Sequence, residues 1–175
     1  MAQTLRLRRF FFEFTRPADT TAYTAQDSVS DSTTAPSIIT WTERPNPTKT
    51  YNQLGLKAGA SYQIKSVKLT KNNNTTTNAS FDMYFFTSGV TNTNDNSEMG
   101  ITYANKIYRI GKTAFTLAVA GTTQSNCAEQ VITDVNHVFI ATGTTFYSTL
   151  VVTAAYTPIS GNIFYGEATL LEIEQ

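Results

Sequence analysis

Cysteine and histidine are nearly absent from the chain, which contains one of each, Cys127 and His137. A single cysteine cannot form an intrachain disulfide or a thiolate zinc cluster, so we expect Cys127 to be a small apolar side chain in or near a core. A single histidine leaves little material for acid–base catalysis near neutral pH. Both shortages indicate a domain that folds in a reducing compartment and needs no disulfide or metal.

Charge is also scarce, because charged residues make up 15% of the chain against about 25% in typical soluble domains. The 13 basic and 13 acidic residues cancel, and this balance argues against nucleic acid or an anionic membrane as a partner. No apolar run approaches the ~20 residues of a membrane helix. The run Phe10-Phe11-Phe12 is too short for a signal peptide, and neighbouring arginines crowd it.

What the chain does contain is β-branched and aromatic residues in short runs, separated by Asn, Gly, Ser and Pro clusters. This pattern predicts an all-β fold, a two-sheet antiparallel sandwich of the jelly-roll type with long polar loops. We expect a single domain, with an N-terminal strand or arm at residues 1–16 continuous with a sandwich at 17–175. Strands are predicted at residues 3–16, 37–42, 61–71, 80–87, 106–110, 114–120, 131–141, 145–155 and 162–172.

The alternation of apolar residues predicts one irregularity in the strand at 61–71. Tyr62 and Ile64 share one phase, whereas Val67 and Leu69 have the other. A β-bulge near Ser66 absorbs such a slip.

The N-terminal segment alternates apolar and basic residues before a run of three phenylalanines. Leu5 and Leu7 differ in parity from Phe10 and Phe12, which predicts a second slip near residues 8 and 9. One interpretation is an edge strand with protective charge, and another is an arm that adds to a neighbouring subunit, with arginines pairing with carboxylates there. The predicted interface consists of Leu5, Arg6, Leu7, Arg8, Arg9, Phe10 and Phe12.

Three polar stretches are predicted to be exposed loops, at residues 44–47, 71–78 and 91–97. The oxygen-rich run at residues 92–98 offers ligands of the kind that calcium prefers, but it lacks the spacing of a helix-loop-helix calcium site. Asn and Asp are also ordinary turn formers, so a cation at this loop stays an open alternative. We expect no cofactor.

Features typical of enzymes are missing around the few reactive residues. His137 has no accompanying Gly-x-Ser-x-Gly elbow, and the glycines form no phosphate loop. Carboxylates occur in loops or on apparent outer faces, at Asp82, Asp95, Glu98, Glu129 and Asp134. We therefore expect a protein that is no enzyme and has no small-molecule substrate.

Two segments carry a resemblance to known proteins. Residues 15–30 contain Arg-Pro-Ala-Asp-Thr-Thr-Ala-Tyr and residues 154–164 contain Ala-Tyr-Thr-Pro-Ile-Ser-Gly. Together with residues 62–69, 81–86 and 95–96, they resemble a family of small virion structural proteins of tailed bacteriophages. The chain departs from that family's pattern in its N-terminal Phe/Arg segment and near Pro45.

The resemblance implies a capsid decoration or cement protein, a group that includes several jelly rolls, with no catalytic residues to carry over. The implied partners are the major capsid protein and further copies of the chain, as a dimer or trimer. The implied location is the capsid surface of the virion, after synthesis in the cytoplasm of a host bacterium. The alternative is a tail or fibre module that binds carbohydrate or a receptor through Trp41, Tyr51 or Tyr103, although Trp41 is expected in the core.

Overall fold

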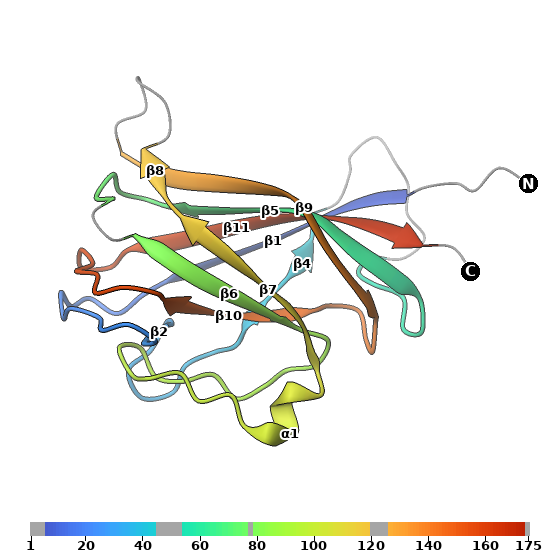
Figure 1. The fold of residues 1–175 in the computed structure, drawn as a ribbon, viewed down its shortest axis with the longest axis horizontal. Coiled ribbons are helices and arrows are strands. Elements are labelled where there is room, and N and C mark those ends of the chain that lie inside the picture. Colours follow the sequence, from blue (N-terminus) through green and yellow to red (C-terminus); the bar gives the residue numbers. More distant parts are fainter. Residues whose placement is uncertain (1–5, 45–53, 77–78, 120–125, 174–175) are drawn as a thin grey trace, which may run out of the picture.

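The computed structural model describes residues 6–44, 54–76, 79–119 and 126–173, and in it two antiparallel sheets face each other (Figure 1). One sheet has the strand order β4-β1-β11-β5-β9-β8, and the other has the order β2-β10-β6-β7 with β3 paired to β10. The predicted all-β sandwich is therefore confirmed. The elements are β1 (Arg6–Thr15), β2 (Ser28–Val29), β3 (Ile39–Thr40), β4 (Thr42–Glu43), β5 (Ser61–Lys71), β6 (Ser80–Phe86), α1 (Tyr103–Lys106), β7 (Arg109–Thr116), β8 (Ala118–Val119), β9 (Ala128–Ile140), β10 (Tyr147–Val152) and β11 (Ile163–Ile173).

Aromatic side chains from both sheets fill the space between them. The Trp41 ring stacks on Phe146 with centroids 5.1 Å apart, and Phe12 meets the Trp41 ring edge-on at 4.8 Å. The Trp41 Nε1–H donates to Ser148 Oγ at 3.0 Å, so the polar end of this buried ring has a partner. These contacts join β1 to β10 through the crossing segment that contains Trp41.

The bulge predicted near Ser66 is confirmed. In the pairing of β5 with β11, Ser66 lies opposite Thr169 and Ile64 lies opposite the next residue, Leu170, so β5 carries Lys65 as an extra residue. In the pairing with β9, Ile64 lies opposite His137 and Ser66 lies opposite Thr133, so there β9 carries the extra residues. Two of them, Asp134 and Asn136, have φ near +58°, which Asp and Asn tolerate better than most residues. The shift keeps all four core residues of β5 buried.

The slip predicted near residues 8 and 9 is wrong. β1 pairs with β11 in unbroken register from Arg6 to Thr15, and the inward series continues through Phe10 to Arg8. Leu7 therefore faces outward and is 61% exposed. Hydropathy misled here because the buried position is occupied by an arginine with a dedicated partner.

The single strand predicted at residues 37–42 is two strands in different sheets. β3 pairs with β10, whereas β4 pairs with β1, and Trp41 lies between them. The chain crosses from one sheet to the other at this buried tryptophan. The short strand β2 had no periodic signal and was not predicted.

The separate strands predicted at 106–110 and 114–120 are also wrong. Residues 103–106 form α1, and β7 runs continuously through Gly111. A Cβ at Gly111 would lie 2.6 Å from the His137 ring, so glycine permits a close approach here and forms no turn.

Two loops expected to be solvent-facing are partly buried. The segment after β5 leads to β6 in the other sheet, and Lys71 and Asn73 are buried. In the loop at 91–97, Asn92 and Asp95 are buried as well. The third predicted loop lies outside the described residues from position 45 onward.

Candidate functional site

The structure divides the predicted N-terminal interface into two groups. Arg6, Leu7 and Arg9 have exposed side chains, whereas Arg8, Phe10 and Phe12 are buried within the sandwich. Leu5 lies outside the described residues. The interface stays a prediction, and only the exposed group can contact a partner from the folded chain. β1 is also not an edge strand, because it lies between β11 and the short β4.

Arg8 is buried because Glu43 on the neighbouring strand receives it. Its Nε and Nη2 donate to the two carboxylate oxygens of Glu43 at 2.8 and 2.6 Å. Burial alone would lower the pKa of Arg8, but the hydrogen bonds and charge of Glu43 outweigh it, so this pKa lies above its ordinary value. The Arg8 guanidinium is thus bound to a carboxylate within its own chain.

The outer face of the six-stranded sheet carries two rows of uncharged side chains at one end. By strand register, Leu7 lies beside Leu171, then Gln63 and Val138. The adjacent row runs from Ile173 through Ser61 to Ile140. We call the five apolar members the apolar strip, namely Leu7, Val138, Ile140, Leu171 and Ile173.

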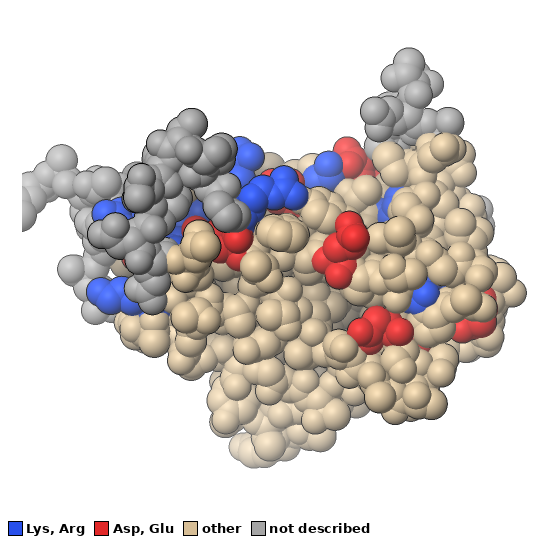
Figure 2. Space-filling model, turned by 180° about the vertical axis from the view of Figure 1, so that it is seen from behind, with Lys and Arg blue, Asp and Glu red and all other residues tan. Residues whose placement is uncertain are grey.

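Charge surrounds this end of the sheet without entering the strip. Arg6 and Arg9 flank Leu7 along β1, and Lys65 lies at the bulge of β5. Figure 2 shows the molecule from behind, with charged side chains scattered over the upper and middle parts of this face and none over its lowest part. An apolar strip beside charged groups is typical of a surface that another protein covers.

The segments that carry the resemblance meet in one buried polar group, which we call the Arg16 cluster: Arg16, Asp19, Tyr23 and Asp95. Arg16 Nη2 donates to Asp95 Oδ2 at 2.8 Å, and Arg16 Nε donates to the Tyr23 hydroxyl at 2.8 Å. The Tyr23 hydroxyl in turn donates to Asp95 Oδ1 at 2.6 Å. The Arg16 and Asp95 side chains are fully buried, so each depends on the other for charge compensation.

The C-terminal motif closes over this cluster. The Tyr156 ring stacks on Tyr23 with centroids 6.1 Å apart. The Arg16 backbone N–H donates to the Asn162 carbonyl at 2.9 Å, and the Gly161 N–H donates to the Pro17 carbonyl at 3.3 Å. These contacts tie three segments that are distant in the sequence together as scaffold, namely residues 16–23, Asp95 and residues 156–162.

The same contacts bear on the cation alternative for the loop at 92–98. The Asp95 carboxylate accepts from Arg16, Tyr23 and the Ser30 N–H, so its oxygens are already engaged. Burial, followed by the hydrogen bond to Asp95, raises the pKa of Tyr23. Among the residues that the structure describes, no three His, Cys, Asp or Glu side chains gather in a way that would hold a metal ion.

A third buried cation, Lys71, lies at the end of β5, next to the Tyr156 ring. Its Nζ donates to Asn73 Oδ1 at 2.5 Å and to the Thr75 carbonyl, and it lies 5.7 Å from the centre of the Tyr156 ring. The side chain has 0% exposure, and burial lowers the pKa of Lys71 to about 8. Neutral oxygens and a ring face hold this ammonium group.

The residues considered for catalysis are dispersed. His137 Nε2 lies 3.0 Å from the Lys112 carbonyl, in the close contact with Gly111. Asp82 pairs with Lys112 at 2.7 Å, and Glu129 pairs with Lys68 at 2.7 Å. Each of these groups has a structural partner of its own.

No helix in the described part of the chain is long and apolar enough to cross a membrane.

The aromatic residues considered for carbohydrate binding do not form a site together. Trp41 is fully buried, and Tyr51 lies outside the described residues. Tyr103 is 86% exposed, and Ile107 near it is 72% exposed. No helical turn was predicted here, although the spacing of four between these two residues is the signal for one side of such a turn.

Compared with known proteins, the sequence matches no protein-family model and has no significant match among curated proteins.

Proposed function

We propose that the chain is a structural protein of a bacteriophage virion, a decoration or cement protein that binds the outer capsid surface and stabilises contacts between major capsid protein subunits. The apolar strip is the observation that carries this proposal. Its five apolar side chains, with the uncharged Gln63 and Ser61 between them, lie on the outer face of a sheet and have basic residues at their border. The resemblance of residues 15–30 and 154–164 supplies the class of partner.

The organisation of buried polar groups supports a structural role. In the Arg16 cluster and the Arg8–Glu43 pair, charged groups engage one another inside the sandwich. Such fully hydrogen-bonded networks rigidify a core and favour one packing arrangement. This is the arrangement expected of a protein whose task is to hold other surfaces together.

The connectivity supports the jelly-roll form that belongs to this proposal. The principal strands are ordered β1-β11-β5-β9 in one sheet and β2-β10-β6-β7 in the other. The chain changes sheets between β1 and β2, β3 and β4, β5 and β6, β7 and β8, β9 and β10, and β10 and β11. Repeated exchange between two antiparallel sheets is typical of paired Greek keys, an architecture common in viral capsid domains.

The direct test is binding of the purified chain to particles that lack it. We expect saturable co-sedimentation with heads and an increase in the temperature at which the heads lose their DNA. Val138→Asp, which places a charge within the apolar strip, is expected to weaken binding at least about tenfold, because a carboxylate would be desolvated in the contact.

Val131→Asp provides a matched control. Val131 lies on the same strand as Val138, and their exposures are similar, 53% and 57%. Val131 lies opposite Lys68 on β5, outside the apolar strip. Binding that is equally weak in both variants would show that the strip is not the docking surface. A chain that binds purified tails or a glycan array and ignores heads would replace the proposal with the tail-module alternative.

A further inference from the structure

A single helical turn projects from the sandwich and buries none of its own residues. This turn, α1, lies in the connection between β6 and β7, and it projects away from both sheets (Figure 1). Tyr103 and Ile107 are four residues apart and therefore share one side of it, and Tyr108 follows at 37% exposure. We call Tyr103, Lys106, Ile107 and Arg109 the knob.

Backbone hydrogen bonds give the knob a fixed shape. The N–H groups of Asn105 and Lys106 both donate to the Thr102 carbonyl, at 3.1 and 3.2 Å. The Thr87 N–H donates to the Tyr108 carbonyl at 2.9 Å and fastens the base of the turn to the end of β6. Two apolar side chains are thus displayed on an ordered support, which lowers the entropy lost when they bind.

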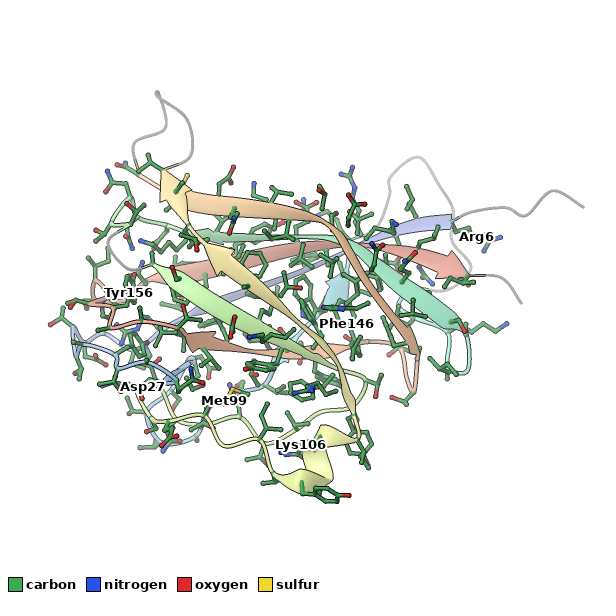
Figure 3. The ribbon with its side chains drawn as sticks, viewed as in Figure 1. Arg6, Asp27, Met99, Lys106, Phe146 and Tyr156 are labelled. Atoms are coloured by element: carbon green, nitrogen blue, oxygen red, sulfur yellow. The ribbon has the colours of Figure 1, made fainter. Side chains whose placement is uncertain are left out.

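The knob is positively charged. Residues 99–116 contain Lys106, Arg109 and Lys112 but no Asp or Glu. Lys112 is paired with Asp82, whereas Lys106 and Arg109 take part in none of the ion pairs found among the described residues. Figure 3 shows Lys106 at the projecting turn, below the two sheets and well apart from Arg6.

A pocket elsewhere on the molecule has the complementary character. It lies between β1 of one sheet and the segment at 30–40 beside the other, with a volume of about 210 Å³. Phe12, Phe14, Ile38 and Ile39 provide apolar wall. Its charged lining residues are Glu13 and Asp31, and both are acidic.

The size of the pocket restricts its occupant. Sites for drug-sized ligands span about 300–1,000 Å³, so this pocket suits a single aromatic side chain. The Tyr103 side chain of the same chain does not fill it, because that side chain is 86% exposed.

We propose that the knob of one copy inserts into this pocket of a second copy, with Tyr103 between the phenylalanines and isoleucines and with Lys106 and Arg109 facing Glu13 and Asp31. The net charge of the chain is zero because its basic and acidic residues are equal in number, although the basic knob and the acidic pocket lie at different places on the molecule. The contact joins two unlike patches, so it is heterologous and closes into a ring if the rotation between copies permits. It does not depend on the proposed location in a virion.

The test uses the purified full chain in sedimentation velocity over a range of concentrations. We expect association that increases with concentration, and at least about tenfold weaker association for Tyr103→Ala. Ile38→Trp, which fills the pocket, is expected to weaken association similarly. Unchanged thermal unfolding would show that both variants fold.

Mixing these two variants distinguishes a heterologous from an isologous contact. One variant retains a pocket and the other retains a knob, so the mixture should form dimers and nothing larger. Failure of the mixture to form dimers, when each variant alone is monomeric, would overturn the proposal.

Charge reversal tests the pairing of the two surfaces. Lys106→Glu and Glu13→Lys are each expected to weaken association about tenfold, and the double variant is expected to restore it, because the swapped charges attract again. Lys57→Glu alters an exposed lysine outside both surfaces and should leave association unchanged. A monomeric wild-type chain, or an oligomer indifferent to Tyr103→Ala, would contradict the contact.

Discussion

Two buried cations lie near the Tyr156 ring, and they are compensated in different ways. The Arg16 guanidinium donates to the buried Asp95 carboxylate and to the Tyr23 hydroxyl. The ring of Tyr23 stacks on that of Tyr156. Lys71 has oxygens of Asn73 and Thr75 and the face of the Tyr156 ring. The comparison teaches that one end of the sandwich holds a charge pair that must stay intact beside a lysine whose charge can be lost at moderately alkaline pH.

The largest effect is expected where a buried charge loses its fully buried counter-charge. Asp95→Ala leaves the Arg16 guanidinium buried, and we expect a loss of about 3–5 kcal/mol in the free energy of unfolding, measured with urea. Asp19→Ala removes a half-buried partner of the same guanidinium and should cost less than about 1 kcal/mol. Equal losses would show that the buried pair has no special weight.

The second prediction separates the two cations by pH. The pKa of Lys71 is lowered to about 8 by burial, against an ordinary value of 10.5. Between these values the unfolded chain binds a proton that the folded chain does not, so the free energy of unfolding rises with pH in this window. Between pH 7 and 9.5, the free energy of unfolding of the wild type, measured with urea, should rise by about 2 kcal/mol relative to that of Lys71→Met.

Arg16 contributes nothing to that pH dependence, because its pKa is raised and it stays charged throughout. Tyr156 also stays protonated below pH 9.5, since burial raises its pKa to about 12. A flat difference between wild type and Lys71→Met across this range would mean that Lys71 keeps its ordinary pKa.

The two stacked tyrosines offer a smaller contrast. The Tyr23 hydroxyl bonds to Arg16 and Asp95, so Tyr23→Phe should cost about 1–3 kcal/mol. The buried Tyr156 hydroxyl has no hydrogen-bond partner among the described residues, so Tyr156→Phe should change stability by less than about 1 kcal/mol. The order of the two losses in urea unfolding is the result to check, and a reversed order would refute it.

The smallest effect on stability is expected at the knob. Tyr103→Ala removes a side chain that packs against little of its own chain, and the free energy of unfolding should stay within about 0.5 kcal/mol of wild type. A loss above 1 kcal/mol in thermal or urea unfolding would show that Tyr103 supports the fold.

Much of the architecture follows from local patterns. The strand at 61–71 has the predicted bounds, because its apolar residues alternate cleanly and its bulge leaves a change of phase in the sequence. The inward positions of Phe10 and Phe12 follow from the same parity rule.

The errors occur where a distant partner decides the outcome. Arg8 is buried because Glu43, 35 residues away, receives it, and no local pattern shows that pairing. The break expected between residues 110 and 114 is absent, because β7 continues through Gly111, which lies against the ring of His137. Strands of two residues, such as β2 and β4, have no period to detect and exist through their pairing with longer strands.

The functional surfaces were predicted less completely than the fold. Composition predicted a protein without an active site, which stays a prediction, and it could not show which apolar residues lie on the surface. Leu7 was assigned to the predicted interface, whereas Val138 and Ile140 join it only through the register of β5 and β9. The buried polar contacts of Asp95 likewise require residues 65 and 79 positions away in sequence.

The most direct measurement for the whole account is an electron cryo-microscopy map of the particle that carries this chain. We predict sandwich density on the outside of the head, with the end of the six-stranded sheet that bears Leu7 and Val138 turned toward the shell. Density for the chain on the tail, or a head whose surface contacts the sandwich only through other faces, would contradict the account.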